Sequence, residues 1–417
     1  MGIGTFVNSS SRQRVGSARK AHPSTGDLWL VAVVVALGIF GLVMLYSASP
    51  DFSRTMYGSQ GYIFGKQILF AAIGTIVAVV LARIDYHLYR RVAVPLLIGT
   101  VIALVIVLFT NDVRNNAVRT FFGGSIQPSE LAKLVTILYL SIWLYSKRED
   151  LHQFQLGLIP LAMILGSIGG LIFLQPDLSA ALTIFILGGL LFFLAGGELR
   201  HMLVFIVVAV LGGLAVIQVS QTGKARLGSY LAGLQNPLES SDHVLWSLEA
   251  IFKGKLFGVG IGQATTKLIG LPFAATDSIF AVIVEELGLF GAIGLIGLYA
   301  ALAWRGVKIA SRAPDMLGSL MAGGLTFWII IEAAINMAVM VGLLPFAGNA
   351  LPFVSAGGSN LLSTLAAIGI LLNISKQSDK VSRNANERMI YSATVDLRRR
   401  DRRRSESRPR RPANHAR

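Results

Sequence analysis

Long, uninterrupted apolar segments recur along this chain and limit its fold more than any other feature. A helix needs about 20 apolar residues to cross about 30 Å of hydrocarbon, and these segments have that length. They lack the polar face that a water-exposed helix or strand would show. The composition agrees, since 53% of the 417 residues are hydrophobic and only 14% are charged. We therefore expect an all-α polytopic membrane protein, and we exclude a soluble enzyme.

About ten of these segments are expected to cross the bilayer. The fifth and sixth are separated only by Gln175-Pro176-Asp177, because proline and aspartate cannot continue a lipid-facing helix. The predicted spans are residues 28–46, 64–83, 92–109, 128–146, 156–174, 178–196, 202–219, 278–304, 317–344 and 361–375.

The basic residues set the expected orientation. An even number of spans places both termini on one side, and most of the 37 Lys and Arg residues fall on that side. The positive-inside rule then puts both termini in the cytoplasm. The chain thus divides into a basic N-tail (1–26), a ten-helix membrane domain (27–375) and a basic C-tail (376–417).

The C-tail accounts for much of the formal charge of +15. Its stretch 398–411 reads RRRDRRRSESRPRR, has no apolar periodicity and is expected to be disordered. Such a tail fixes topology and touches anionic membrane lipids, or it docks a partner protein. No nucleic-acid partner is expected.

One connection on the outer side, residues 221–277 between the seventh and eighth spans, is far longer than the others. It contains an apolar, core-forming run from Val244 to Phe257. Its basic residues are Lys224, Arg226, Lys253, Lys255 and Lys267. Loops of this length are usually functional, and basic residues on the outer side oppose the positive-inside rule. We expect an anionic ligand there.

The fourth span opens with the charged residues Glu130 and Lys133. Pro128 fits the first turn of a helix, and the spacing of three places both charged side chains on one face. Arg119 lies in the preceding outer loop and can approach them. The group is either a structural ion pair between helices or a site for a lipid-linked phosphate.

Asp277 is the second candidate site residue, at the boundary between the large outer loop and the eighth span. It is either a helix cap, favoured by the helix dipole, or a general base whose partial burial tunes it for proton abstraction. We expect Glu285, Glu286 and Glu332 to be hydrogen-bond partners between packed helices, and Asp177 to cap the sixth span.

The sequence contains little that indicates metal or nucleotide chemistry. The chain has no cysteine, and its six histidines lack metal-ligand spacing. It also has no G-x-x-x-x-G-K-[ST] loop, so we expect no ATPase.

Several motifs, taken together and in this order, resemble the SEDS family of bacterial cell-wall polymerases, which includes FtsW, RodA and SpoVE. The motifs are Tyr46-Ser47-Ala48-Ser49, Asn116-Ala117-Val118-Arg119, QPSELAK at 127–133, Gln175-Pro176-Asp177-Leu178, LFGVG at 256–260, TDSIFA at 276–281, EELG at 285–288, GLLP at 342–345 and Gly357-Gly358-Ser359. The N-tail, the LFFLAGG stretch at 191–197 and the C-tail look more like FtsW, the division member, than RodA, the elongation member.

The resemblance implies an inverting peptidoglycan glycosyltransferase that polymerises lipid II at the outer face of the cytoplasmic membrane during division. It implies Asp277 as the catalytic residue, with Arg119, Glu130 and Lys133 as essential companions at the substrate. Arg119 and Lys133, with Lys253 or Lys267 as weaker candidates, would meet the pyrophosphate. The expected partners are lipid II, a class B penicillin-binding protein and other divisome proteins.

No cofactor or dedicated metal site is implied, although a divalent cation such as Mg²⁺ or Mn²⁺ could assist. The sequence departs from the family pattern L-P-E-x-H-T-D-F at Phe273, Ala275 and Ser278, and it has Ser179 and Ala356 where Gly and Tyr are usual. A RodA-like elongation polymerase, a lipid II flippase and a non-enzymatic scaffold stay open as alternatives.

Overall fold

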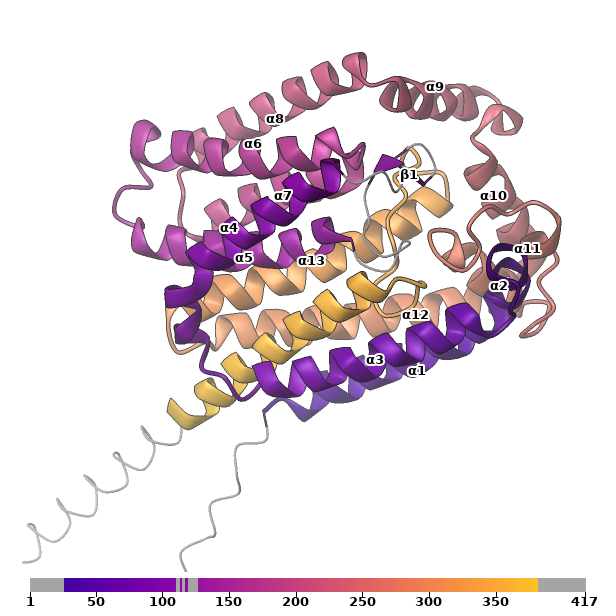
Figure 1. Cartoon of the computed structure of the whole chain (residues 1–417), viewed down its shortest axis with the longest axis horizontal. Helices are drawn as coiled ribbons and strands as arrows, with labels where there is room; N and C mark the ends of the chain where they lie inside the picture. The colour runs from indigo at the N-terminus through magenta and orange to yellow at the C-terminus, as the bar shows by residue number, and fades with distance from the viewer. Residues whose placement is uncertain (1–25, 110–112, 115–116, 119–126, 382–417) are drawn as a thin grey trace, which may run out of the picture.

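The computed structural model describes residues 26–109, 113–114, 117–118 and 127–381, and within them the chain is almost entirely helical (Figure 1). The predicted all-α class is confirmed. A single antiparallel pair of two-residue strands is present in this part of the chain. The elements are α1 (Leu28–Ala48), α2 (Pro50–Tyr57), α3 (Tyr62–Leu81), η1 (Tyr86–Leu88), α4 (Tyr89–Leu108), β1 (Val113–Arg114), β2 (Ala117–Val118), α5 (Pro128–Ser146), η2 (Phe154–Leu158), α6 (Ile159–Leu174), α7 (Leu178–Leu194), α8 (Leu199–Val219), α9 (Gln221–Gln235), η3 (Pro237–Glu239), α10 (Asp242–Gly254), α11 (Thr266–Ile269), α12 (Ile279–Ser311), α13 (Met316–Met340) and a last helix, Gly358–Val381.

Each predicted span overlaps a helix. The last helix runs to Val381, so the predicted boundary at residue 375 is wrong and the first residues assigned to the disordered C-tail are helical. Among the described residues, eight helical segments are long and apolar enough to cross a membrane, and α7 is a shorter apolar helix. The tenth position is α5, which carries Glu130 and Lys133. That all ten cross the bilayer stays a prediction.

The place of α5 in the bundle explains why it tolerates charge. It packs against α4, α7 and α13, and most of its side chains are buried. By contrast, α8 lies along the edge of the bundle, at the top of Figure 1, and buries only Phe205. A helix surrounded by protein can satisfy polar groups that lipid cannot, whereas a helix facing lipid must be apolar.

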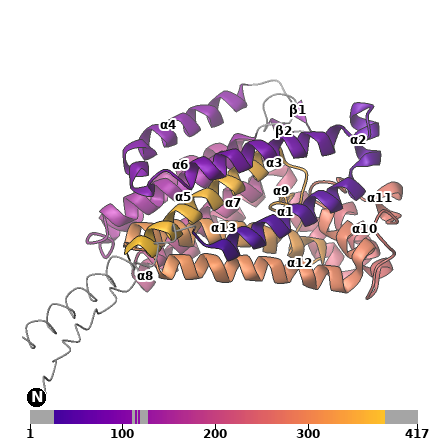
Figure 2. The same cartoon turned by 90° about the horizontal axis from the view of Figure 1, so that it is seen from below.

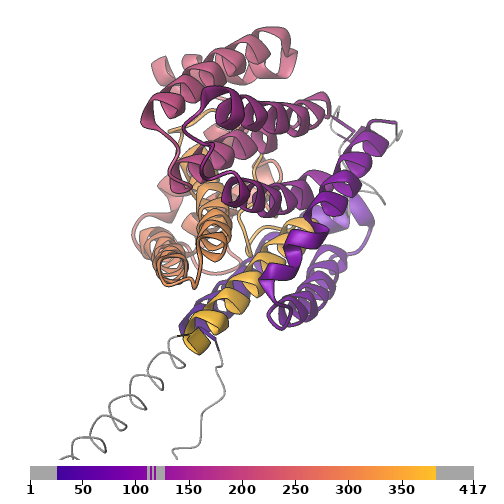
Figure 3. The same ribbon diagram turned by 90° about the vertical axis from the view of Figure 1, so that its left-hand side faces the viewer.

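Glycines let the helices near the chain ends approach closely. A Cβ added at Gly369 of the last helix would lie 2.5 Å from the carbonyl oxygen of Ala78 in α3. One added at Gly41 of α1 would lie 2.3 Å from the carbonyl oxygen of Phe353. The last helix, in yellow, therefore lies beside α3 (Figures 2 and 3), and the segment before it lies against α1. Small residues at such contacts are typical of membrane helices.

The two ends of the bundle differ. Gly26 lies against Lys376, so α1 begins beside the end of the last helix. The short helices α2, α10 and α11 gather at the opposite end (Figure 1). This arrangement agrees with the even number of spans predicted from the sequence.

The predicted outer loop, 221–277, is largely helical. It forms α9, η3, α10 and α11. Helix α10 buries Val244 and Ala250, as the predicted core-forming run requires, but Phe257 at the end of that run is 79% exposed. The run therefore contributes to the core only through α10.

Helix α12 is interrupted at Gly288, which has φ +68° and ψ −166°. The backbone groups freed by the break pair with residues 255–260. The N–H of Val259 donates to the carbonyl oxygen of Glu285 at 2.9 Å, and the N–H of Leu289 donates to that of Lys255 at 3.0 Å. A Cβ added at Gly258 would lie 2.2 Å from the carbonyl oxygen of Glu286. The Gly-rich LFGVG segment thus fits into a broken helix, where buried backbone must find protein partners.

Candidate active site

The ion pair predicted at the start of α5 is present and has a third member. The Lys133 ammonium donates to Glu130 Oε1 at 2.9 Å and also to Glu332 Oε1 of α13. Asn360 of the last helix donates to Glu130 Oε2 at 2.9 Å. Lys133 is 3% exposed and Glu332 2% exposed. Three helices therefore meet at one buried charged cluster, which we call the Lys133 cluster (Glu130, Lys133, Glu332 and Asn360).

This cluster combines two carboxylates with one ammonium. Burying an ion pair costs desolvation energy that often exceeds its attraction, so such pairs are weak evidence for a role in stability alone. Removing one partner, however, typically costs about 3–5 kcal/mol because the other charge is left buried. Glu332 was expected to bond between packed helices, and it does so directly to Lys133.

Asp177 joins α5 to α7. Its side chain accepts from the N–H of Ala180 and caps α7, as predicted. Its Oδ2 also accepts from Gln127 Nε2 at 2.8 Å and from Ser129 Oγ at 3.1 Å. The QPSELAK and QPDL motifs therefore meet through hydrogen bonds at the beginnings of two helices.

Asp277 lies at the beginning of α12 and is half-buried. Ser278 is the N-cap residue of α12, so the helix-cap interpretation of Asp277 is wrong in position by one residue. The Asp277 carboxylate lies near Gly348, since a Cβ added at Gly348 would be 3.4 Å from Asp277 Oδ2.

Three consecutive carbonyl groups fix the backbone around Asp277. The carbonyl oxygen of Ala275 accepts from the N–H of Ala356 at 2.9 Å, and that of Thr276 accepts from Ser355 Oγ at 2.6 Å. The Asp277 carbonyl oxygen accepts from Asn336 Nδ2 at 2.8 Å. These donors come from α13 and from the segment after it. A carboxylate on such a restrained turn is held in one geometry, as a catalytic group requires.

Phe273 adds a strained turn just before this site. Its φ of +50° lies in the left-handed region that favours glycine. Its carbonyl oxygen accepts from the N–H groups of Thr276 and Ser278 at 2.9 and 3.3 Å. The turn therefore leads directly into residues 276–278, of which Ser278 is fully buried.

Helix α13 connects the two candidate sites. Glu332 and Asn336 are four residues apart and lie on one helix face. Glu332 bonds to Lys133, while Asn336 bonds to the backbone of Asp277. The sequence gives a weak signal for this link, because both are polar residues in an otherwise apolar span.

The neighbouring carboxylates Glu285 and Glu286 fasten the outer segment to α12. Glu285 accepts from the N–H and hydroxyl groups of Thr265 and Thr266. Glu286 accepts from Lys267 Nζ at 2.7 Å and from Ser47 Oγ at 2.6 Å. The expected helix-packing role is confirmed for both.

Like Lys133, the two weaker cation candidates are each paired with a carboxylate. Lys267 bonds to Glu286, and Lys253 bonds to Glu249 Oε1 at 2.8 Å. Arg119, the other expected cation, lies outside the described residues. Within the part of the chain that the structure describes, no group of three or more His, Asp or Glu side chains is placed to hold a metal ion.

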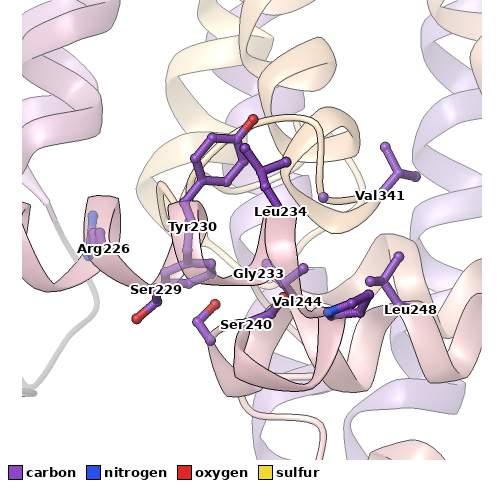
Figure 4. Close-up of a pocket in the computed structure, with 13 residues that line it drawn as sticks. Arg226, Ser229, Tyr230, Gly233, Leu234, Ser240, Val244, Leu248 and Val341 are labelled. Atoms are coloured by element: carbon purple, nitrogen blue, oxygen red, sulfur yellow. The ribbon is translucent and has the colours of Figure 1, made fainter.

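A cavity of about 110 Å³ lies between α9, α10 and the segment after α13 (Figure 4). Arg226, Ser229, Tyr230 and Ser240 give it a polar side, and Tyr230 donates to the carbonyl oxygen of Leu343 at 2.9 Å. The lining residues are Arg226, Ser229, Tyr230, Gly233, Leu234, Pro237, Ser240, Ser241, Val244, Leu248, Val341, Gly342 and Phe346.

Comparison with known proteins gives consistent matches over most of the chain. A family model described as cell cycle protein, and named for FtsW, RodA and SpoVE, matches residues 27–380. A protein of Trichlorobacter lovleyi named probable peptidoglycan glycosyltransferase FtsW is 39% identical over 353 residues, which are 84% of this chain and 93% of the relative. The stage V sporulation protein E of Bacillus subtilis is 36% identical, over 87% of this chain and 99% of the relative.

Solved structures agree with these sequence matches. One, described as structural coordination of polymerization and crosslinking by a peptidoglycan synthase complex, superposes with a TM-score of 0.71 at 28% identity and covers 85% of this chain and 98% of that chain. The rod shape determining protein RodA of Thermus thermophilus superposes with a TM-score of 0.61 at 27% identity, over 85% and 97% of the two chains.

Proposed function

This chain belongs to the family of FtsW, RodA and SpoVE cell cycle proteins, and we propose that it is the peptidoglycan glycosyltransferase of cell division, which polymerises lipid II into glycan strands. Lipid II is a disaccharide peptide linked to undecaprenyl pyrophosphate. The observation that carries the proposal is the restrained turn at Asp277, where three consecutive backbone carbonyls are hydrogen-bonded. It supports a single carboxylate poised for proton abstraction.

In the proposed reaction, Asp277 takes the proton from the GlcNAc 4-hydroxyl of one lipid II molecule. That oxygen forms a bond to C1 of the MurNAc of a second molecule, while the bond from C1 to the pyrophosphate oxygen breaks. The electron pair leaves with undecaprenyl pyrophosphate, and C1 is inverted. Pyrophosphate leaves without a proton from a general acid, so one carboxylate is sufficient, in contrast to glycoside hydrolysis, which uses two.

The departing pyrophosphate needs positive charge. We assign this role to Lys133 and Arg119, because cations placed where negative charge develops lower the barrier. Glu130 then orients the Lys133 ammonium and does not act as a second base. The contact of Glu130 with Asn360 supports this division, since a hydrogen-bonded carboxylate is fixed in place.

A crosslinking partner follows from the same assignment. We propose that a class B penicillin-binding protein crosslinks the strands that this chain makes, and the solved peptidoglycan synthase complex supports this pairing. Other divisome proteins and membrane lipids complete the set of partners. The chain is a multi-pass membrane protein, and we place it in the bacterial cytoplasmic membrane with both termini in the cytoplasm.

The test is incubation of the purified full-length protein with lipid II, without nucleotide, in the absence and presence of a class B penicillin-binding protein. Glycan polymer in either reaction is the expected result. Movement of lipid II across a vesicle membrane without polymer would replace the proposal with a flippase. If folded protein with its partner present gives no polymer and no movement of lipid II, the result would favour a scaffold.

A further inference from the structure

His243 of α10 lies within a stack of aromatic rings that joins the outer segment to the Asp277 turn. Its ring stacks on Phe346 with centroids 3.9 Å apart and on Phe273 with centroids 5.8 Å apart. Phe52 of α2 meets Phe273 edge-on at 6.0 Å. The Arg226 guanidinium of α9 lies 5.4 Å from the Phe346 ring centroid. These rings belong to segments far apart in the sequence, so the stack fixes how those segments meet.

The imidazole also reaches the residue next to Asp277. His243 Nδ1 lies 3.3 Å from Ser278 Oγ. Ser278 is fully buried, and as the N-cap of α12 it makes no side-chain capping hydrogen bond. Its hydroxyl is therefore used for the contact with α10 and not for the helix end. Ser278 and Phe273 are also two positions at which this sequence departs from the L-P-E-x-H-T-D-F pattern.

The electrostatic setting keeps the ring neutral. Burial and the nearby Arg226 charge lower the pKa of His243 to about 4, against the opposing effect of Asp242. A neutral imidazole has one donor and one acceptor nitrogen, so Nδ1 can pair with a hydroxyl in either sense. The contact with Ser278 is therefore available throughout the neutral pH range.

We propose that His243 is a positioning residue for the glycosyl transfer: through Ser278 it fixes the turn that carries the Asp277 carboxylate. Activity then depends on the docking of α10, and with it the outer segment, onto the beginning of α12. This inference rests on the proposed function. The competing explanation is that His243 only fills space in the aromatic stack.

Two substitutions of His243 separate positioning from packing. His243→Phe keeps an aromatic ring and removes the hydrogen bond to Ser278. His243→Asn keeps a polar atom near the place of Nδ1 and removes the stack. If His243 positions Asp277, the Phe variant should lose about 3-fold to 10-fold in kcat at a near-normal melting temperature, with KM for lipid II little changed. The Asn variant should keep more of its kcat at a lower melting temperature.

Ser278→Ala tests the same contact from the other side. It should lower kcat to the same degree, and the double variant His243→Phe/Ser278→Ala should be no slower than either single variant, because both remove one interaction. His201→Phe on α8 is a matched control, since His201 also lies against a phenylalanine ring, that of Phe154. Its kcat should equal that of the unchanged protein.

The results that would overturn this inference are a Phe variant with normal kcat, or losses that simply add in the double variant. Failure of the proposed function gives a different pattern. If the unchanged protein makes no polymer, or Asp277→Asn still makes it, the function or its base is wrong whatever His243 does.

Discussion

Asn336 Nδ2 lies 2.8 Å from the backbone carbonyl oxygen of Asp277 and 2.6 Å from that of Asn349. One amide thus holds the beginning of α12 and the segment after α13 together. It sits one helical turn from Glu332, which bonds to Lys133. The position of the proposed base and the position of the proposed cation are therefore set by neighbouring turns of the same helix.

Replacing Asn336 with Leu should slow polymerisation by at least about 10-fold, because two partly buried carbonyl groups lose their donor. The folded state should also lose about 1–3 kcal/mol. Activity on lipid II and the melting temperature in detergent measure the two effects. A variant with normal kcat would show that this amide does not position Asp277.

To test the role of the Lys133 cluster, the variants must keep its buried charges balanced. Lys133→Met alone should destabilise the protein by about 3–5 kcal/mol, since Glu130 and Glu332 would remain buried without their cation. The triple variant Lys133→Met/Glu130→Gln/Glu332→Gln leaves no buried charge in the cluster and should regain a near-normal melting temperature.

We predict that this triple variant is folded and inactive, because the cation that meets the pyrophosphate is missing. The comparison is polymer formation at matched amounts of folded protein. A triple variant that polymerises lipid II normally would reduce the cluster to a lock between helices.

Gly258 should be the most sensitive position in the LFGVG motif. Alanine there would have to adopt φ +77° and would place its Cβ 2.2 Å from the carbonyl oxygen of Glu286. Residues 255–260 could then not pack against the break in α12. Gly262→Ala is the matched control, because it has a similar φ of +85° but no atom within 4 Å. We expect a sharp loss of folded yield for Gly258→Ala and a smaller decrease in melting temperature for Gly262→Ala. Equal effects would mean that only the backbone angle matters.

His243 should also make stability depend on pH. Its folded pKa of about 4 lies below its ordinary value of 6.5, so between these values the unfolded chain binds a proton that the folded chain does not. The contribution of the neutral His243 ring to the free energy of unfolding is complete above pH 6.5 and is lost as the pH falls towards 4. The melting temperature of the unchanged protein should therefore fall more steeply over this range than that of His243→Phe. Parallel curves would contradict the assignment of a neutral, half-buried ring.

The sequence was sufficient for features that depend on local spacing. Apolar length located most of the long helices, because a stretch of about 20 apolar residues predicts a helix that can cross the bilayer. The spacing of three predicted the pair of Glu130 and Lys133, and the turn chemistry of proline and aspartate predicted the cap at Asp177.

Features that depend on contacts between distant segments could not be predicted. The break at Gly288 needs residues 255–260 beside it, and no local pattern indicates that approach, although both segments are rich in glycine. Glu332 was recognised as a buried carboxylate, but its direct bond to Lys133 joins residues on two helices far apart in the sequence. His243 carried no signal at all, since a single histidine in a loop has many ordinary roles.

The most direct test of the central claim is the rate of lipid II polymerisation by Asp277→Asn, compared with Asp51→Asn, which changes an exposed carboxylate of α2 at the same end of the bundle. Asparagine keeps the shape of the side chain and removes the base, so both variants should be folded and present in equal amounts. We predict that Asp277→Asn is slower by at least about 100-fold, the usual contribution of a general base, while Asp51→Asn is unchanged. A rate for Asp277→Asn within about tenfold of that of the unchanged protein would contradict the account.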